Sequence, residues 1–162
     1  MSTIHRTGGV QIKHAAVALT GSVPTRDIRL GDPLAYLTTS NVSSVYPASA
    51  QAFDTNLATT QTAFVAAFMG MSEGNSRAAS TDARDLTVPV NIAPDAVYEG
   101  DMNAAADLEV GDLIGPAANG TTSLKNTYVQ TSTKATSIGV VIEDRASSTR
   151  VLFMVINQLG KK

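Results

Sequence analysis

Hydrophobic and polar residues alternate along much of this chain, which is the pattern of half-buried β-strands. Over residues 86–92, aliphatic side chains occupy every second position and are therefore predicted to share one face of a strand. Pro89 has no N–H to donate, so this strand should lie at a sheet edge or bond on only one side at that position. Residues 15–19 predict a short buried strand. Residues 151–156 are apolar throughout, which predicts a strand covered on one face by its own core and on the other by a further body such as another subunit.

A six-residue pattern occurs twice, 80 residues apart. Residues 27–32 (DIRLGD) and 107–112 (DLEVGD) share the order Asp, aliphatic, charged, aliphatic, Gly, Asp. Because glycine tolerates positive φ, each copy predicts a short strand entering a hairpin. Similar landmarks follow in the same order in both halves: an apolar segment with one glycine (68–71 and 137–140), acidic and Arg residues, and a closing strand (86–92 and 151–156). This order predicts an internal duplication with one strand order in both halves; the alternative is that Gly-Asp turns and Ala-rich strands recur by chance.

One segment has a different period. Residues 47–67 are poor in glycine and rich in alanine, and Phe53, Leu57 and Phe64 recur at intervals typical of a helix face. This predicts a helix near residues 48–60, which residues 54–56 would cap or interrupt, followed by extended chain at 64–71.

The fold class that follows is all-β or mainly β. We expect two similar small β lobes, each barrel- or sandwich-like, with one short helix in the first half. Residues 1–14 are polar and contain Gly8-Gly9, which predicts an extended N-terminal arm with a flexible joint, either a disordered tail or docked along a partner surface. Residues 15–94 should form the first lobe with its helical insertion, and residues 95–162 the second lobe.

Composition and charge exclude several classes of protein. The net charge of −2 lacks the basic excess of a general nucleic-acid binder. The absence of cysteine excludes disulfides, thiolate metal sites and cysteine nucleophiles. No apolar stretch approaches the roughly 18 to 20 residues that span a bilayer, and none suits a signal peptide, so we expect no membrane association. Aromatic residues make up only 5% of the 162 residues, which predicts a thin core whose missing buried area comes from oligomerisation or docking.

The chemistry of the sequence predicts no enzyme. His5 and His14 both precede the predicted core, and no Gly-x-Ser-x-Gly elbow presents a nucleophile. Acidic residues gather between positions 99 and 112, but their spacing departs from that of a calcium loop and favours a solvated face. We therefore expect no catalytic residue, cofactor, metal or small-molecule substrate.

Three parts of the chain together resemble a known family. They are the Gly-Asp hairpins, the stretch ATTQTAFVAAFMG at 58–70, and the ending formed by IGVV at 138–141 with VLF at 151–153. In these features the chain resembles the capsid decoration (cement) proteins of tailed bacteriophages. The resemblance implies a β-rich subunit, commonly a homotrimer, on the outer capsid surface of the virion. It would bind the major capsid protein and stabilise the lattice by bridging its subunits.

Candidate partner-binding residues lie in two polar segments. The arm and the 72–85 loop are the segments that we expect to contact the capsid, with these candidates: Ile4, His5, Arg6, Val10, Ile12, Lys13, Arg77 and Arg84. The alternative function is a receptor- or glycan-binding module of a head fibre or spike. It is less favoured because the chain has no Trp and only four Tyr with which to stack on sugars.

Overall fold

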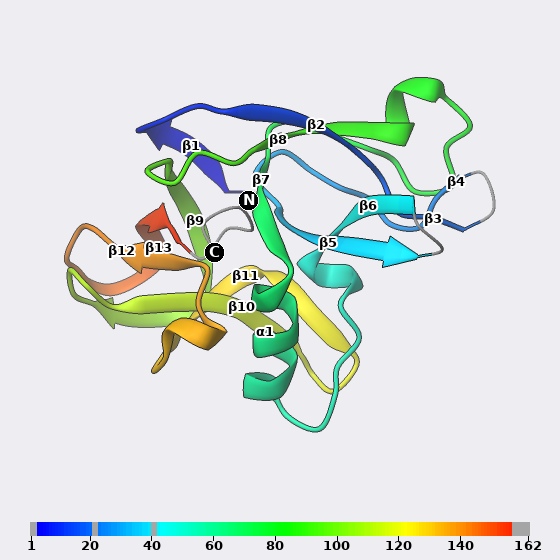
Figure 1. Ribbon diagram of the computed structural model, residues 1–162. Coiled ribbons are helices and arrows are strands. Elements are labelled where there is room, and N and C mark those ends of the chain that lie inside the picture. Colours follow the sequence, from blue (N-terminus) through cyan, green and yellow to red (C-terminus); the bar gives the residue numbers. More distant parts are fainter. Residues whose placement is uncertain (1–2, 21–22, 40–41, 157–162) are drawn as a thin grey trace.

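The computed structural model describes residues 3–20, 23–39 and 42–156, and within these ranges the chain is mainly β with one α-helix (Figure 1). This confirms the predicted fold class. The strands are β1 (Ile4–Thr7), β2 (Ile12–Ala16), β3 (Leu19–Thr20), β4 (Val23–Pro24), β5 (Pro33–Thr39), β6 (Val42–Pro47), β7 (Phe68–Ser72), β8 (Thr87–Asn91), β9 (Val97–Leu108), β10 (Leu113–Asn119), β11 (Ser123–Thr131), β12 (Gly139–Val141) and β13 (Arg145–Val155). The helices are α1 (Leu57–Ala66) and three short 3₁₀ turns, η1 (Ala48–Ala50), η2 (Ala83–Leu86) and η3 (Lys134–Thr136).

The strands form two small barrels, which we call lobe 1 and lobe 2. In lobe 1 the strand order is β2-β8-β7-β5-β6, and a parallel bridge between Val17 and Val45 brings the last strand back to the first. In lobe 2 the order is β9-β13-β12-β10-β11, and the ring closes through the parallel pair Met102 and Tyr128. Figure 1 shows lobe 1 at the upper right and lobe 2 at the lower left.

The two lobes correspond strand by strand, which confirms the internal duplication. In β5 of lobe 1, Leu34 lies opposite Gly70 of β7. In β10 of lobe 2, Ile114 lies opposite Gly139 of β12. The closing parallel bridges also fall at corresponding places in the two barrels. Unrelated strand orders would have contradicted the duplication, and the orders are the same.

The helix belongs to the first half of the chain, packs against lobe 2 and starts later than expected. The prediction of a helix near 48–60 is wrong: Ala48–Ala50 forms only a 3₁₀ turn, and α1 spans Leu57–Ala66. The Asn56 side chain accepts a hydrogen bond from the Thr59 N–H at 2.9 Å and caps the helix there. Phe64 therefore belongs to α1, and extended chain begins only at Phe68. The Gln61 amide reaches the Pro116 carbonyl of lobe 2 at 2.8 Å, so a helix from the first half packs on the second barrel.

The predicted N-terminal arm is extended, but it pairs within the chain. β1 lies antiparallel to β9 of lobe 2, and β2 lies antiparallel to β8 of lobe 1. The predicted boundary between residues 14 and 15 thus falls inside β2. Gly8 and Gly9 link these strands in tight contact with Asp95, where a Cβ on Gly8 would lie 2.0 Å from the Asp95 carbonyl oxygen. The flexible joint expected there is a close-packed crossing, because only glycine fits beside that backbone.

The structure also tests the strand predictions made for Pro89 and for residues 151–156. β8 lies between β2 and β7, so the expectation of an edge strand at Pro89 is wrong. The second possibility stated for Pro89, bonding on only one side, applies instead. β7 ends at Ser72, so no ladder bond requires an N–H from Pro89, and the Pro89 carbonyl still accepts the Glu73 N–H at 2.8 Å. Along 151–156, buried and half-buried residues alternate, so the outer face of this strand is only partly covered within the chain.

Candidate partner-binding surface

Each lobe presents the same turn at its surface. In lobe 1 the Arg29 N–H donates to Asp32 Oδ2 at 2.8 Å, and in lobe 2 the Glu109 N–H donates to Asp112 Oδ2 at 2.9 Å. The glycine between them has φ +83° at Gly31 and +100° at Gly111, a conformation that L side chains rarely adopt. The repeated pattern thus encodes an Asp-closed turn whose geometry is set by its own residues.

A second set of hydrogen bonds anchors each turn to its barrel. The Leu30 N–H donates to Asn75 Oδ1 at 2.9 Å, and the Val110 N–H donates to Asp144 Oδ1 at 2.6 Å. Leu30 and Val110 are 41% and 62% exposed, respectively. Both lobes therefore hold an aliphatic side chain outward on a braced turn. Sequence reasoning missed these two residues, although the aliphatic position just before each repeated glycine was the signal that would have found them.

The two turns differ in what lies beside them. The turn of lobe 1 is covered by the start of the chain, and a Cβ on Gly31 would lie 1.7 Å from the Thr3 carbonyl oxygen. The Thr3 hydroxyl in turn hydrogen-bonds the buried Tyr128 hydroxyl of lobe 2 at 2.8 Å. Gly111 has no atom within 4 Å of the corresponding position. Thr3 therefore ties the turn of lobe 1 to lobe 2.

A polar hollow of about 540 Å³ adjoins this junction. Its wall combines Asp27, Arg29 and Asp32 of lobe 1 with β11 residues of lobe 2, including Lys125 and Asn126. Asp32 is only 4% exposed, and burial raises the pKa of its carboxyl to about 6 despite the hydrogen bond from the Arg29 N–H. A proton on Asp32 therefore binds more tightly in the folded chain than in the unfolded one.

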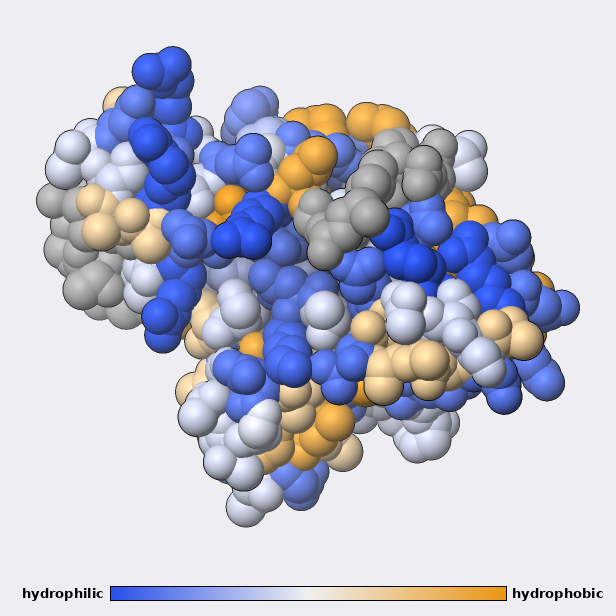
Figure 2. Space-filling model, turned by 180° about the vertical axis from the view of Figure 1, so that it is seen from behind, coloured by the Kyte–Doolittle hydropathy of each residue, from blue (hydrophilic) through white to orange (hydrophobic). Residues whose placement is uncertain are grey.

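β2 and the residues just before it form an exposed part of the predicted contact surface. Val10 just before it is 63% exposed and Ile12 is 43% exposed, while Ala15 alone within β2 is buried. The Lys13 ammonium lies 6.0 Å from the centre of the Tyr36 ring. Seen from behind, the molecule carries hydrophobic surface near the middle of its upper edge (Figure 2).

The loop between β7 and β8 is held by two carboxylates. Asp85 accepts hydrogen bonds from the Ser80 hydroxyl at 2.5 Å and from Arg77 Nε at 3.1 Å. The hydrogen bond from Ser80, followed by the one from the Arg77 N–H, holds the pKa of the Asp85 carboxyl below its usual value. Asp82 pairs with Arg84 at 3.2 Å in the same loop. The two predicted contact residues in this loop, Arg77 and Arg84, are thus held by carboxylates of the same loop. Their side chains are 71% and 91% exposed, respectively.

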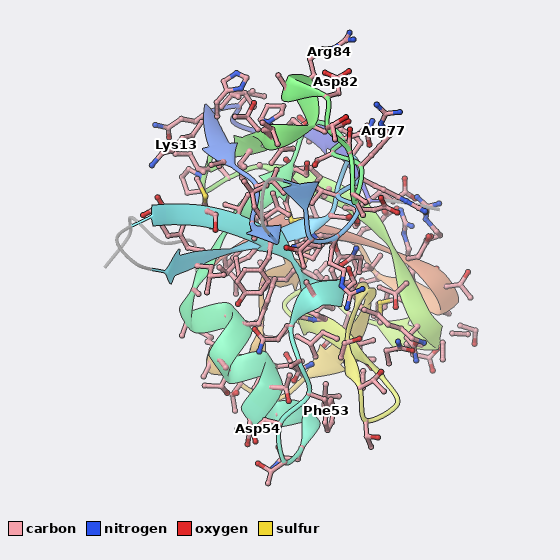
Figure 3. The ribbon with its side chains drawn as sticks, turned by 90° about the vertical axis from the view of Figure 1, so that its right-hand side faces the viewer. Lys13, Phe53, Asp54, Arg77, Asp82 and Arg84 are labelled. Atoms are coloured by element: carbon pink, nitrogen blue, oxygen red, sulfur yellow. The ribbon has the colours of Figure 1, made fainter. Side chains whose placement is uncertain are left out.

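The structure places these predicted residues at one end of the molecule. Figure 3 shows Lys13, Arg77 and Arg84 at the upper end, opposite Phe53 and Asp54 at the lower end. Ile12 is next to Lys13 in β2, and Val10 lies just before that strand. The other predicted residues, Ile4, His5 and Arg6, have their backbone in β1, and their side chains lie outside the described part of the structure.

Most of the acidic side chains between residues 99 and 112 contact other residues of the chain. Glu99 pairs with Arg145 at 3.2 Å, and Asp101 pairs with Arg150 at 3.3 Å. Asp107 accepts the Ser147 N–H at 2.7 Å. Within residues 3–20, 23–39 and 42–156, no three His, Asp or Glu side chains are grouped so as to hold a metal ion. The described helices include none long and apolar enough to cross a membrane.

Comparison with known proteins gives one structural likeness. No family model matches the sequence, and a search of curated proteins finds no significant match. Among solved structures, the chain is similar to the N base of the head fibre protein gp8.5 of bacteriophage phi29, with 15% sequence identity and a TM-score of 0.48, over 93% of this chain and 97% of that one. At this identity and TM-score, no residue role passes from one chain to the other.

Proposed function

We propose that this chain is a structural virion protein that binds the outer surface of a phage capsid and stabilises the lattice by bridging major capsid proteins. The observation that carries the proposal is the exposed aliphatic surface of a small, duplicated barrel protein. Leu30, Val110, Val10 and Ile12 are each between 41% and 63% exposed. Leu30 and Val110 lie on braced turns, Ile12 lies in the paired strand β2, and Val10 precedes that strand. Aliphatic side chains held outward on rigid elements are suited to burial by a partner.

The arrangement of the lobes supports the bridging part of the proposal. Lobe 1 and lobe 2 each carry the same turn with an aliphatic tip, so one subunit offers two similar contact points. Two weak contacts within one rigid body bind more tightly than either alone, because the second contact forms at a high effective concentration. A ligand that binds only the assembled lattice raises the free energy needed to open it, without any reaction. A homotrimer would multiply the contacts further.

The sequence resemblance points to the same function. Most of the residues that carry it form corresponding parts of the two barrels, namely the Gly-Asp turns and the strands in which Gly70 and Gly139 lie opposite buried aliphatic residues. Residues 58–66 lie in α1. These residues build the folded frame. The contact residues would be those that this frame holds outward.

Co-sedimentation with capsids tests the proposal. Purified protein is mixed with phage capsids assembled without it and centrifuged, and the bound fraction is measured against concentration. We expect saturable binding at a fixed ratio to the major capsid protein. The paired variant Leu30→Ser with Val110→Ser should weaken binding more than either single change. Protein that stays in the supernatant at every concentration would refute the proposal.

A glycan array addresses the alternative receptor-binding function in the same preparation. Two of the four tyrosines, Tyr98 and Tyr128, are fully buried and have no ring surface for a sugar. We therefore expect no glycan signal. Saturable glycan binding with no capsid binding would assign the chain to a receptor-binding module instead.

A further inference from the structure

Among the described residues, the edge of β2 that faces away from β8 carries no paired strand at Ile12 and His14. In the part of the chain that the structure describes, β2 pairs with β8 alone and meets β6 only through the bridge at Val17. The Val17 N–H donates to the Leu86 carbonyl at 3.0 Å, and the Gln11 carbonyl accepts the Ile92 N–H at 2.8 Å, so odd-numbered residues turn their backbone groups toward β8. The N–H and C=O groups of Ile12 and His14 therefore point away from β8, at residues that are exposed.

The duplication shows what belongs at this edge. Val97 and Glu99 of β9 correspond to Ile12 and His14, because both pairs stand at the same register against the closing strand of their barrel. The Ala96 carbonyl accepts the Val155 N–H at 3.0 Å, so Val97 and Glu99 also turn their backbone groups away from that strand. In lobe 2 this edge is occupied by β1, which runs antiparallel to β9 opposite these two residues. Among the described residues of lobe 1, no strand pairs with β2 at the corresponding place.

We propose that the β2 edge of lobe 1 accepts an extended segment of the capsid partner as an added antiparallel strand opposite Ile12 and His14. This proposal rests on the proposed function. Strand addition to an open edge uses backbone hydrogen bonds for affinity and alternate side chains for selectivity. It would complete in lobe 1 the sheet that β1 completes in lobe 2.

A second copy of this chain is a poorer occupant. Its β1 is already paired with its own β9. Pairing of two β2 strands through their open edges would place two Lys13 side chains on one face of the joint sheet, and like charges there oppose association. The favoured partner segment instead alternates acidic residues, on the face of Lys13, with apolar residues, on the face of Val10 and Ile12.

Proline at position 14 tests the edge without breaking the ladder. Because the His14 N–H faces the open edge, His14→Pro removes a donor that β8 does not use and puts a ring in the path of an added strand. His14→Thr is the matched control, since it removes the imidazole but keeps the N–H. In capsid co-sedimentation we expect His14→Thr to bind within about threefold of the original protein and His14→Pro to bind about tenfold or more weakly.

Hydrogen–deuterium exchange provides a readout that does not depend on how the variant folds. In the original protein, the amides of Ile12 and His14 should exchange fast when free and about tenfold or more slowly on capsids, whereas those of Lys13 and Ala15 should already be slow. Unchanged exchange at Ile12 and His14 on capsids, or equal binding of His14→Pro and His14→Thr, would overturn the strand-addition proposal while leaving capsid binding intact. Absence of capsid binding by the original protein would instead refute the proposed function. Self-association in ultracentrifugation that is abolished by His14→Pro would assign the edge to a second copy and overturn the proposal.

Discussion

The two repeated glycines give a matched pair for testing how the start of the chain locks the lobes together. Gly31→Ala and Gly111→Ala make the same change in the same turn, at φ +83° and +100°. Holding an alanine in this left-handed backbone conformation lowers the unfolding free energy by roughly 1–2 kcal/mol. For Gly111→Ala we expect that cost alone, because nothing lies within 4 Å of the new Cβ.

Gly31→Ala should cost more, because its Cβ would lie 1.7 Å from the Thr3 carbonyl oxygen. The start of the chain must then move away from the turn. That movement breaks the 2.8 Å hydrogen bond between Thr3 and Tyr128, worth about 1 kcal/mol, and disturbs the pairing of β1 with β9. Together with the strain of overpacking, we expect Gly31→Ala to lose about 1–3 kcal/mol more than Gly111→Ala.

Urea unfolding followed by circular dichroism measures both variants, and limited proteolysis adds a local readout. Gly31→Ala should also make the Gly8-Gly9 crossing more sensitive to protease, whereas Gly111→Ala should not. Equal losses of unfolding free energy in the two variants, within about 0.5 kcal/mol, with unchanged cleavage near Gly8, would refute the idea that Thr3 locks the turn of lobe 1 to lobe 2.

Three further predictions follow from the contacts described. Burial raises the pKa of Asp32 from 3.8 to about 6, so the folded protein binds the Asp32 proton more tightly than the unfolded chain does. The stability that this proton contributes is fully present below pH 4 and is lost as the pH rises through 6. Asp32→Asn should therefore stabilise the protein at pH 7 by up to about 3 kcal/mol but hardly at pH 4. The half-exposed Asp112→Asn is the control for thermal melts across this pH range, and a gain for Asp32→Asn that does not depend on pH would contradict the assignment. Asn56→Ala should cost about 1 kcal/mol in urea unfolding by removing the cap of α1, and Asn56→Asp should restore most of it; equal stability of the three proteins would rule out the cap. Deletion of residues 2–14 removes β1 and part of β2, so it should lower the Tm by roughly 5 °C or more along with any loss of binding, and an unchanged Tm would contradict the pairing of this segment.

The duplication was readable in the sequence because a turn depends on neighbouring residues. Gly31 and Gly111 supply positive φ, and the following Asp closes the turn onto a backbone N–H only three residues before it. Such local requirements place the same residue types at corresponding positions in both halves. The strand alternation at 86–92 was readable for a similar reason, since Val88 and Val90 are fully buried on one face.

The sequence does not predict that residues 1–14 pair within the chain, because the residues they contact are distant in sequence. Thr3 meets Tyr128 across 125 positions of sequence, and no local pattern in residues 1–14 announces that pairing. The helix was misplaced for another reason. The periodic apolar residues Phe53, Leu57 and Phe64 suggest one helix face, but the Asn56 cap and the contact of Gln61 with Pro116 decide where the helix lies. The open edge of β2 depends on the pairing of distant strands, which no local pattern in the sequence shows.

Electron cryomicroscopy of capsids saturated with the protein tests the central claim most directly. We predict added density on the outer surface of the shell, large enough for both lobes, that touches more than one major capsid protein and continues through a partner strand beside β2. Density that is absent at saturation, lies inside the shell, or touches only one major capsid protein would contradict the proposed bridging function.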